Sequence, residues 1–241
     1  MKQGGKEVRN SNDFLAAFNR IEQFLSNGNS SERYRPFTQL VRDQTKSNVT
    51  VKRNEDRLIK FATLRNAIVH ESTQGAYAIA EPHKSVVEEI ERVEKELTNP
   101  PKVITHFNKK VETFKHNNSM AEVLKIIRDR DYTQFPVYQE EEFIGLLTEN
   151  GITKWLARNI EEDIISLEET NLIDILEFEE EADNYIFIGR EITVYEAEEI
   201  FKDFSYTRAR LDALLITHSG KKKESLLGII TTWDILQLYK T

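Results

Sequence analysis

Residues 227–234, "LGIITTWD", place a hydroxyl and a carboxylate three positions apart, where a short apolar strand is expected to stop. If Thr231 opens the turn into a final helix, its hydroxyl and the unpaired backbone amides of that helix suit a phosphate group. Asp234 would repel a phosphate but can accept hydrogen bonds from two neighbouring hydroxyl groups. The structural alternative is that Thr231 caps the helix and Asp234 is a first-turn acid favoured by the helix dipole. The spacing alone leaves a binding site and a helix cap open.

A second group, within "LRNAIVHE", combines residues that can move a proton and hold negative charge. Asn66 and His70 are four residues apart and so share one face of a helix. A histidine, with an unperturbed pKa of about 6.5, can transfer protons at neutral pH, and Arg65 can hold a developing negative charge. The structural alternative is that the helix dipole favours His70 and that Arg65 pairs with an acid such as Glu71.

These candidates stand in a chain whose length and composition indicate a soluble protein of two domains. The 241 residues exceed the roughly 100 to 200 typical of one domain. No apolar run approaches the roughly 18 residues of a membrane helix, and the first ten residues lack the apolar stretch of a signal peptide. We therefore expect a cytoplasmic protein with no membrane partner.

The sequence predicts no metal site. It contains no cysteine, which excludes disulfides, thiolate metal ligands and a cysteine nucleophile. The remaining histidines stand at no metal-ligand spacing that we recognise; they are His83, His106, His116 and His218.

Charge is distributed unevenly along the chain. Residues 1–70 carry 13 Lys and Arg against 7 Asp and Glu, a surplus of +6, whereas residues 101–241 carry 17 against 27, or −10. The basic part could meet an anion such as RNA, whereas the acidic part needs a local site to hold any phosphate. The alternative is that the uneven charge only reflects ordinary solvent-exposed surfaces.

The domain boundary is expected at "LTNPPKV", because two successive prolines cannot continue a helix. Before it, apolar residues recur at three- and four-residue steps within 12–25, 58–68 and 86–97, and Pro36 suits the first turn of a further helix. Residues 1–99 are therefore predicted to form an all-α four-helix bundle, and residues 100–241 a second domain.

The second domain is predicted to contain two copies of one α/β unit, about 101–160 and about 170–241. Each copy has a capping-box pattern, at Ser119 and at Thr193, followed by a helix and two strands joined by a turn. Gly145 and Gly228 occupy matching places in the second strands. Each copy is too small to bury its strands alone, so the two copies should pack against each other.

These segments carry a resemblance to a known family. "LIDIL", "FPVY" and above all "GIITTWD" resemble a pair of CBS repeats, the cystathionine beta-synthase type. The resemblance implies an α+β fold of two β-α-β-β-α repeats packed face to face. It also implies a regulatory module that binds a small adenosyl ligand, namely AMP, ADP, ATP or S-adenosylmethionine, in the cleft between the repeats.

The same resemblance assigns roles to individual residues. Thr231 is implied for the phosphate and Asp234 for the two ribose hydroxyls. The adenine is implied to lie against Thr105 before the first strand and against Tyr132 and Thr133 before "FPVY". Arg210 is a candidate for the phosphate charge, although the family's basic position falls strictly on Leu211 or Asp212.

The first copy lacks part of this pattern. Its turn, "GLLTENGI", keeps Thr148 but has Gly151 where the second copy has Asp234. We therefore predict one good nucleotide site and a second that is weak, altered or empty. The alternative is that Glu149 or Asn150 substitutes for the missing carboxylate.

The group Arg65, Asn66 and His70 resembles the motif of HEPN domains, helical bundles that often dimerise and some of which are metal-independent ribonucleases. A homodimer is expected on this resemblance. Two functions stay open. The protein is either a nucleotide-sensing regulator whose helical domain mediates dimerisation or effector contacts, or a HEPN-type ribonuclease gated by nucleotide binding to the paired repeats.

Overall fold

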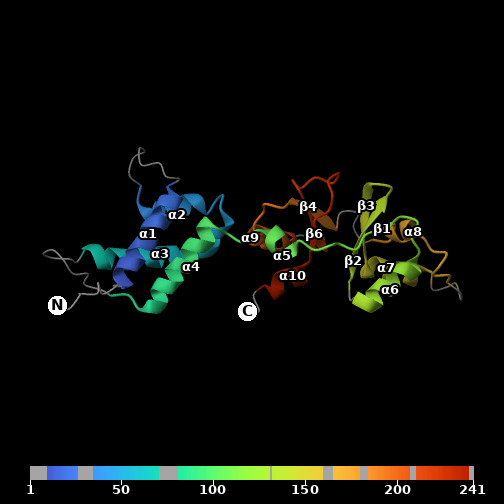
Figure 1. Ribbon diagram of the computed structural model, residues 1–241, viewed down its shortest axis with the longest axis horizontal. Helices are drawn as coiled ribbons and strands as arrows, with labels where there is room; N and C mark the ends of the chain where they lie inside the picture. Colours follow the sequence, from blue (N-terminus) through green and yellow to red (C-terminus); the bar gives the residue numbers. More distant parts are fainter. Residues whose placement is uncertain are drawn as a thin grey trace, which may run out of the picture. The chain divides into compact units, whose positions relative to one another are not determined.

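The computed structural model describes residues 10–26, 35–70, 81–130, 132–159, 165–179, 184–206 and 210–238, apart from the side chain of His70. The chain divides into two compact units, Met1–Pro101 and Lys102–Thr241 (Figure 1).

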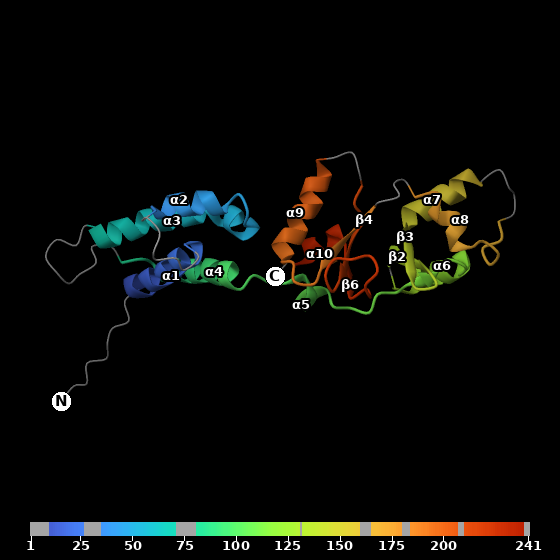
Figure 2. The same ribbon diagram turned by 90° about the horizontal axis from the view of Figure 1, so that it is seen from above.

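The described residues of the first unit form four helices, as the sequence predicts. They are α1 (Asn10–Leu25), α2 (Phe37–Gln44), α3 (Val49–His70) and α4 (Lys84–Thr98). Helix α1 lies beside α4, and α2 lies beside α3 (Figure 2). Pro36 immediately precedes α2, at a position where its missing amide hydrogen costs no helical hydrogen bond.

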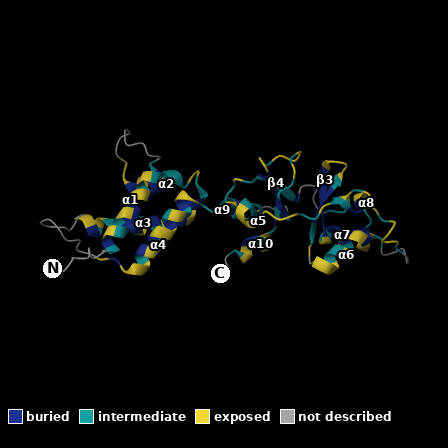
Figure 3. Cartoon of the chain, viewed as in Figure 1, coloured by how far each residue is buried: buried dark blue, intermediate teal, exposed yellow. Residues whose placement is uncertain are grey.

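The core of this unit is apolar and rich in phenylalanine. The rings of Phe14 and Phe61 meet edge to face at 6.0 Å, and Phe18 lies 4.4 Å from Phe37 between ring centroids. Buried and exposed residues alternate along α4 (Figure 3), because its apolar side chains recur at helical spacing from Val87 to Leu97. The four helices are therefore held together by one shared core.

The second unit consists of two repeats with the same topology. The first contains α5 (Val103–Phe107), β1 (Phe114–Lys115), α6 (Met120–Arg130), β2 (Gln134–Gln139), β3 (Glu142–Thr148) and α7 (Glu149–Arg158). The second contains α8 (Leu172–Leu176), β4 (Tyr185–Gly189), α9 (Val194–Ser205), β5 (Ala213–Thr217), β6 (Gly228–Ile230) and α10 (Thr232–Gln237). In each, the first strand pairs parallel with the second, and the second pairs antiparallel with the third. The predicted β-α-β-β-α repeat is confirmed.

The short leading helices exchange places between the repeats. Val103 and Phe107 of α5 pack into the core of the second repeat, whereas Leu172 and Ile175 of α8 pack into the core of the first. The matching glycines make room for this exchange. A Cβ at Gly228 would lie 2.1 Å from the carbonyl oxygen of Phe107 in α5, and one at Gly145 would lie 3.2 Å from Leu176 in α8.

The two sheets meet face to face through an apolar cluster. Phe143 and Leu146 of β3 are buried together with Ala213 and Leu215 of β5. Phe143 also meets Tyr185 of β4 edge to face, at 4.9 Å between ring centroids. This shared core fixes one repeat against the other. None of the helices in the described part of the chain is both long enough and apolar enough to span a bilayer.

Candidate functional site

A cavity of about 510 Å³ lies within the second unit and is lined by residues of both repeats. Its volume falls in the range of roughly 300 to 1,000 Å³ that is typical of small-molecule sites. Five of the six ligand residues predicted from the sequence line it; they are Tyr132, Thr133, Arg210, Thr231 and Asp234. The fold therefore brings together residues that are about a hundred positions apart in the chain.

Thr231 and Asp234 form a helix cap and also line the cavity. The Thr231 hydroxyl accepts a hydrogen bond from the Asp234 amide at 3.3 Å, and Asp234 Oδ2 accepts from the Thr231 amide at 2.8 Å. The Thr231 hydroxyl also donates to Asp234 Oδ2 at 2.7 Å. Both bonds that the carboxylate accepts use Oδ2, so within the described part of the chain Oδ1 is left for a ligand. The cap is therefore compatible with a ligand contact at Asp234. The Thr231 amide and hydroxyl, proposed from the sequence for a phosphate, both donate to Asp234 instead.

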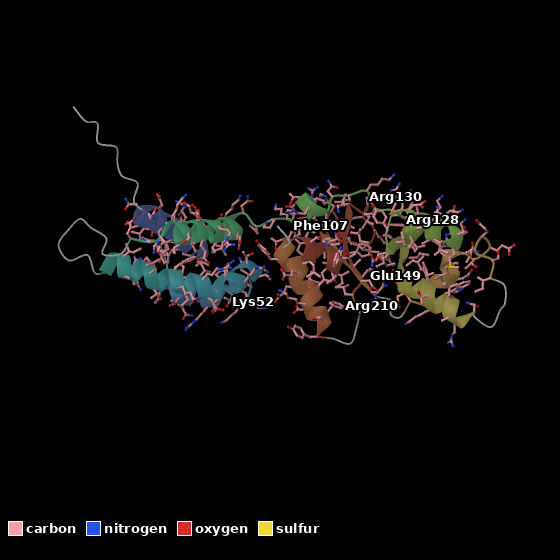
Figure 4. All side chains as sticks on the ribbon, turned by 90° about the horizontal axis from the view of Figure 1, so that it is seen from below. Lys52, Phe107, Arg128, Arg130, Glu149 and Arg210 are labelled. Atoms are coloured by element: carbon pink, nitrogen blue, oxygen red, sulfur yellow. The ribbon has the colours of Figure 1, made fainter. Side chains whose placement is uncertain are left out.

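Charged groups of both signs surround the cavity. Lys109, Lys110 and Arg210 supply positive charge, and Glu112, Asp212 and Asp234 supply negative charge. The Arg210 Nε donates to Asp212 Oδ1 at 2.6 Å. Arg210 lies where the second repeat faces the first (Figure 4), with its side chain 50% exposed, so a ligand can reach it.

Two aromatic side chains at the cavity are open to solvent. Tyr132 is 45% exposed and Trp233 is 63% exposed. Large apolar rings that are partly exposed suit stacking against a planar base. Tyr132 was predicted from the sequence, whereas Trp233 was not, because it stands at a variable position between Thr231 and Asp234.

Thr105 lies away from this lining. It is an exposed residue of α5, and its hydroxyl donates to the Lys102 carbonyl at 2.6 Å. The segment before β1 that reaches the cavity is 109–112 instead. Sequence reasoning missed this segment because β1 is only two residues long, too short to show a strand pattern. The two adjacent lysines of "FNKKVE" were the feature of the sequence that could have indicated a phosphate-binding segment here.

The matching turn of the first repeat is built differently. Thr148 caps α7 and is 1% exposed, and its amide donates to Glu179 Oε1 at 2.6 Å. Its hydroxyl donates to Glu179 Oε2 at 3.0 Å. The carboxylate bonded to Thr148 therefore belongs to Glu179, which sequence reasoning missed, rather than to Glu149 or Asn150. Glu179 lies 31 residues further along the chain, so no local pattern could have indicated it.

A comparison with protein families agrees with this architecture. The family model of the CBS domain matches residues 103–158 and 181–241, one match for each repeat. The second unit is a pair of CBS domains. The turn with Thr231 and Asp234 and the turn with Thr148 each fall inside one of the two matches. Among curated proteins, none matches the chain.

Solved structures resemble the chain at low sequence identity. A putative signal-transduction protein with CBS domains from Burkholderia ambifaria MC40-6 is 14% identical, with a TM-score of 0.44, over 58% of this chain and 93% of that one. The CBS domain pair of protein MJ0100, in complex with 5-methylthioadenosine and S-adenosyl-L-methionine, is 18% identical, with a TM-score of 0.44, over 58% and 96%. An uncharacterized conserved protein from Pyrococcus horikoshii is 16% identical, with a TM-score of 0.43, over 59% and 94%.

Glu179 sits in a polar network between the two CBS repeats. Burial raises the pKa of its carboxyl above the usual range, and this outweighs the two hydrogen bonds from Thr148, which lower the pKa. Asp212 raises the pKa further, and Arg210 opposes it. The buried amide of Asn184 donates to Glu179 Oε2 at 3.4 Å and to Asp212 Oδ2 at 3.1 Å. Because Asp212 also binds Arg210, the network reaches the cavity.

The candidate catalytic group of the helical unit lies at the end of α3. The Arg65 Nη1 donates to Asn66 Oδ1 at 3.3 Å; Asn66 is exposed and Arg65 is half-buried. His70 is the last residue of α3, and its side chain lies outside the described residues, as does Glu71. The proton-transfer role of this group therefore stays a prediction. Among the described residues, no cluster of three or more His, Cys, Asp or Glu could hold a metal ion.

Proposed function

We propose that the CBS pair binds an adenine nucleotide or another adenosyl ligand in its cavity and that the protein is a regulator that senses this ligand. The observation that carries the proposal is Asp234, whose carboxylate lines a cavity of about 510 Å³ while one of its oxygens is left for a ligand. A fixed carboxylate oxygen can accept hydrogen bonds from the two hydroxyls of a ribose, and such bonds to a charged group are strong.

The opposite charges at the cavity support a division of roles along the ligand. Arg210, Lys109 and Lys110 would hold phosphate oxygens, whereas Asp234 would hold the sugar. The partly exposed rings of Tyr132 and Trp233 would cover the adenine. The phosphates of AMP, ADP or ATP would use these cations, whereas the three acids of the cavity would suit the positive sulfonium centre of S-adenosylmethionine, so all four ligands stay candidates.

The helical unit is proposed as the dimerisation or effector module of this regulator. The charge surplus of residues 1–70 and the resemblance of the unit to HEPN domains support contact with a second copy or with an anionic partner such as RNA. Ligand sensing requires that the ligand favour one of two conformations of the protein.

A thermal-shift series on the full chain tests the proposal. AMP, ADP, ATP and S-adenosylmethionine are compared with GMP at equal concentration, and calorimetry then measures the affinity of each ligand that acts. A ligand that binds only the folded state at about 100 times its Kd adds about 2.7 kcal/mol to the free energy of unfolding. At least one adenosyl ligand should raise the melting temperature. No shift with any of the four, or an equal shift with GMP, would overturn the assignment.

A further inference from the structure

The two half-sites of the CBS pair take their carboxylates from different places. At Thr231 the carboxylate comes from Asp234, in the same helical turn. At Thr148 it comes from Glu179, which approaches from beyond α8. In both half-sites the threonine donates its amide and its hydroxyl to the carboxylate. Glu179 therefore reproduces from a distance the contact that Asp234 makes locally.

Glu179 has room for this contact because residue 151 is a glycine. A Cβ at Gly151 would lie 2.1 Å from Glu179 Oε1 and 2.5 Å from its Cδ. Real Cβ contacts essentially never fall below 3.0 Å. A side chain at residue 151 and the carboxylate of Glu179 in its observed position exclude one another.

Both oxygens of Glu179 are engaged inside the protein. Oε1 accepts from the Thr148 amide, and Oε2 accepts from the Thr148 hydroxyl and from Asn184. Thr148 and Asn184 are buried, at 1% and 3% exposed. Asp234 differs, because its bonds to Thr231 use Oδ2 alone and its side chain borders a cavity. The Thr148 half-site is thus closed by a group of the chain itself.

We propose that Glu179 is the resident occupant of the Thr148 half-site and that each chain therefore binds one adenosyl ligand, at Asp234, instead of two. This inference rests on the proposed function of the cavity. A ribose entering the Thr148 half-site finds both carboxylate oxygens engaged, and a phosphate meets a carboxylate that repels it when ionised. Glu179 is in this sense the residue that sets the number of ligands.

The first test needs no ligand. Gly151→Ala should lower the melting temperature of the wild-type chain, because the new methyl group displaces the Glu179 carboxylate. In a Glu179→Ala background, Gly151→Ala should lower the melting temperature markedly less, because no carboxylate then occupies the space of the new methyl group. Alanine is also more favourable than glycine inside a helix. Glu177→Ala, an exposed acid of the same segment, is the control background and should leave the cost unchanged. Equal costs in all three backgrounds would overturn the proposal.

The second test counts ligands by calorimetry on the full chain, with AMP as the probe. The wild type should bind one AMP per chain, and Asp234→Ala should keep no site of wild-type affinity. Gly151→Asp combined with Glu179→Ala restores a carboxylate three residues after Thr148 and removes the occupant, so this double variant should bind two. Two AMP per chain in the wild type, or one AMP bound by Asp234→Ala with wild-type affinity, would overturn the inference.

The two tests also separate this inference from the proposed function. If no adenosyl ligand binds the wild type, the proposed function fails, whereas the melting-temperature cycle still decides whether Glu179 fills the half-site. If the wild type binds AMP and the double variant folds but stays at one AMP per chain, the proposed function stands and the role of Glu179 falls.

Discussion

Asp234 holds Thr231 through a single carboxylate oxygen: Oδ2 accepts the Thr231 amide at 2.8 Å and the Thr231 hydroxyl at 2.7 Å. One residue therefore closes the cap of α10 and presents its other oxygen to the cavity. Structure and binding are coupled at this point, and variants of Asp234 should affect both.

Asp234→Ala should weaken binding of the adenosyl ligand at least about tenfold. A hydrogen bond to a charged group contributes about 1.5–3 kcal/mol, and about 1.4 kcal/mol corresponds to a factor of ten in Kd. Calorimetry on the full chain measures the loss.

The same variant should lower the free energy of unfolding by about 1 kcal/mol through the lost cap. Glu196→Ala is the matched control, because Glu196 closes the same kind of capping box with Thr193 in α9 but does not line the cavity. Both variants should lose similar stability, and only Asp234→Ala should lose affinity. Equal affinity loss in both would show that the cap, and not the ligand contact, is responsible.

Arg210→Ala should weaken AMP binding more than adenosine binding. Arg210 is the cavity arginine, and only AMP offers a phosphate for it to hold. The AMP affinity of the variant should also depend less on salt, since one screened charge interaction is gone. Arg128→Ala, which removes an exposed arginine paired with its neighbour Asp129, is the control. An identical loss for adenosine and AMP would contradict a phosphate contact.

Gly228→Ala should destabilise the CBS pair by about 1–3 kcal/mol, the usual cost of overpacking. The added methyl group would meet the backbone carbonyl of Phe107, so α5 must shift away from the second repeat. Gly189→Ala is the control, because its nearest neighbour lies at an ordinary contact distance of 3.5 Å. Urea unfolding of both variants measures the difference, and equal stabilities would contradict the close approach of α5.

The repeats could be predicted from the sequence because their signals are local. The capping residues Ser119 and Thr193 and the strand glycines Gly145 and Gly228 mark the same positions in two copies. The exchange of α5 and α8 between the cores could not be predicted, because a five-residue helix carries no sign of which sheet it will cover.

The residues of the candidate site also differ in whether the sequence could predict them. The motif residues Thr231 and Asp234 were found because they lie within one turn of each other. The lysines of the segment 109–112 and the carboxylate of Glu179 reach their places only through the packing of the repeats. Long-range contacts of this kind leave no trace in spacing.

The regulatory proposal gives the helical unit no catalytic role, so the wild type should leave single-stranded and structured RNA intact with or without AMP. Gel analysis of labelled RNA after incubation with the full chain measures this. Cleavage that is lost in His70→Ala and kept in His83→Ala would establish the ribonuclease alternative instead, because removing a general acid–base costs about 10²–10⁴ in rate.

The buried carboxyl of Glu179 should make stability depend on pH in a specific direction. Burial raises its pKa in the folded state, whereas in the unfolded chain the carboxyl titrates near 4.5. The stabilising effect of its proton is therefore fully present below pH 4.5 and is lost as the pH rises through the folded-state pKa.

Glu179→Gln keeps the shape of the side chain and removes its titration. The stability of this variant relative to the wild type should therefore rise with pH across that interval and then level off. Urea unfolding from about pH 4 to about pH 8 follows this difference, with the exposed Glu177→Gln as control. A constant difference at every pH would mean that Glu179 does not change its proton affinity on folding.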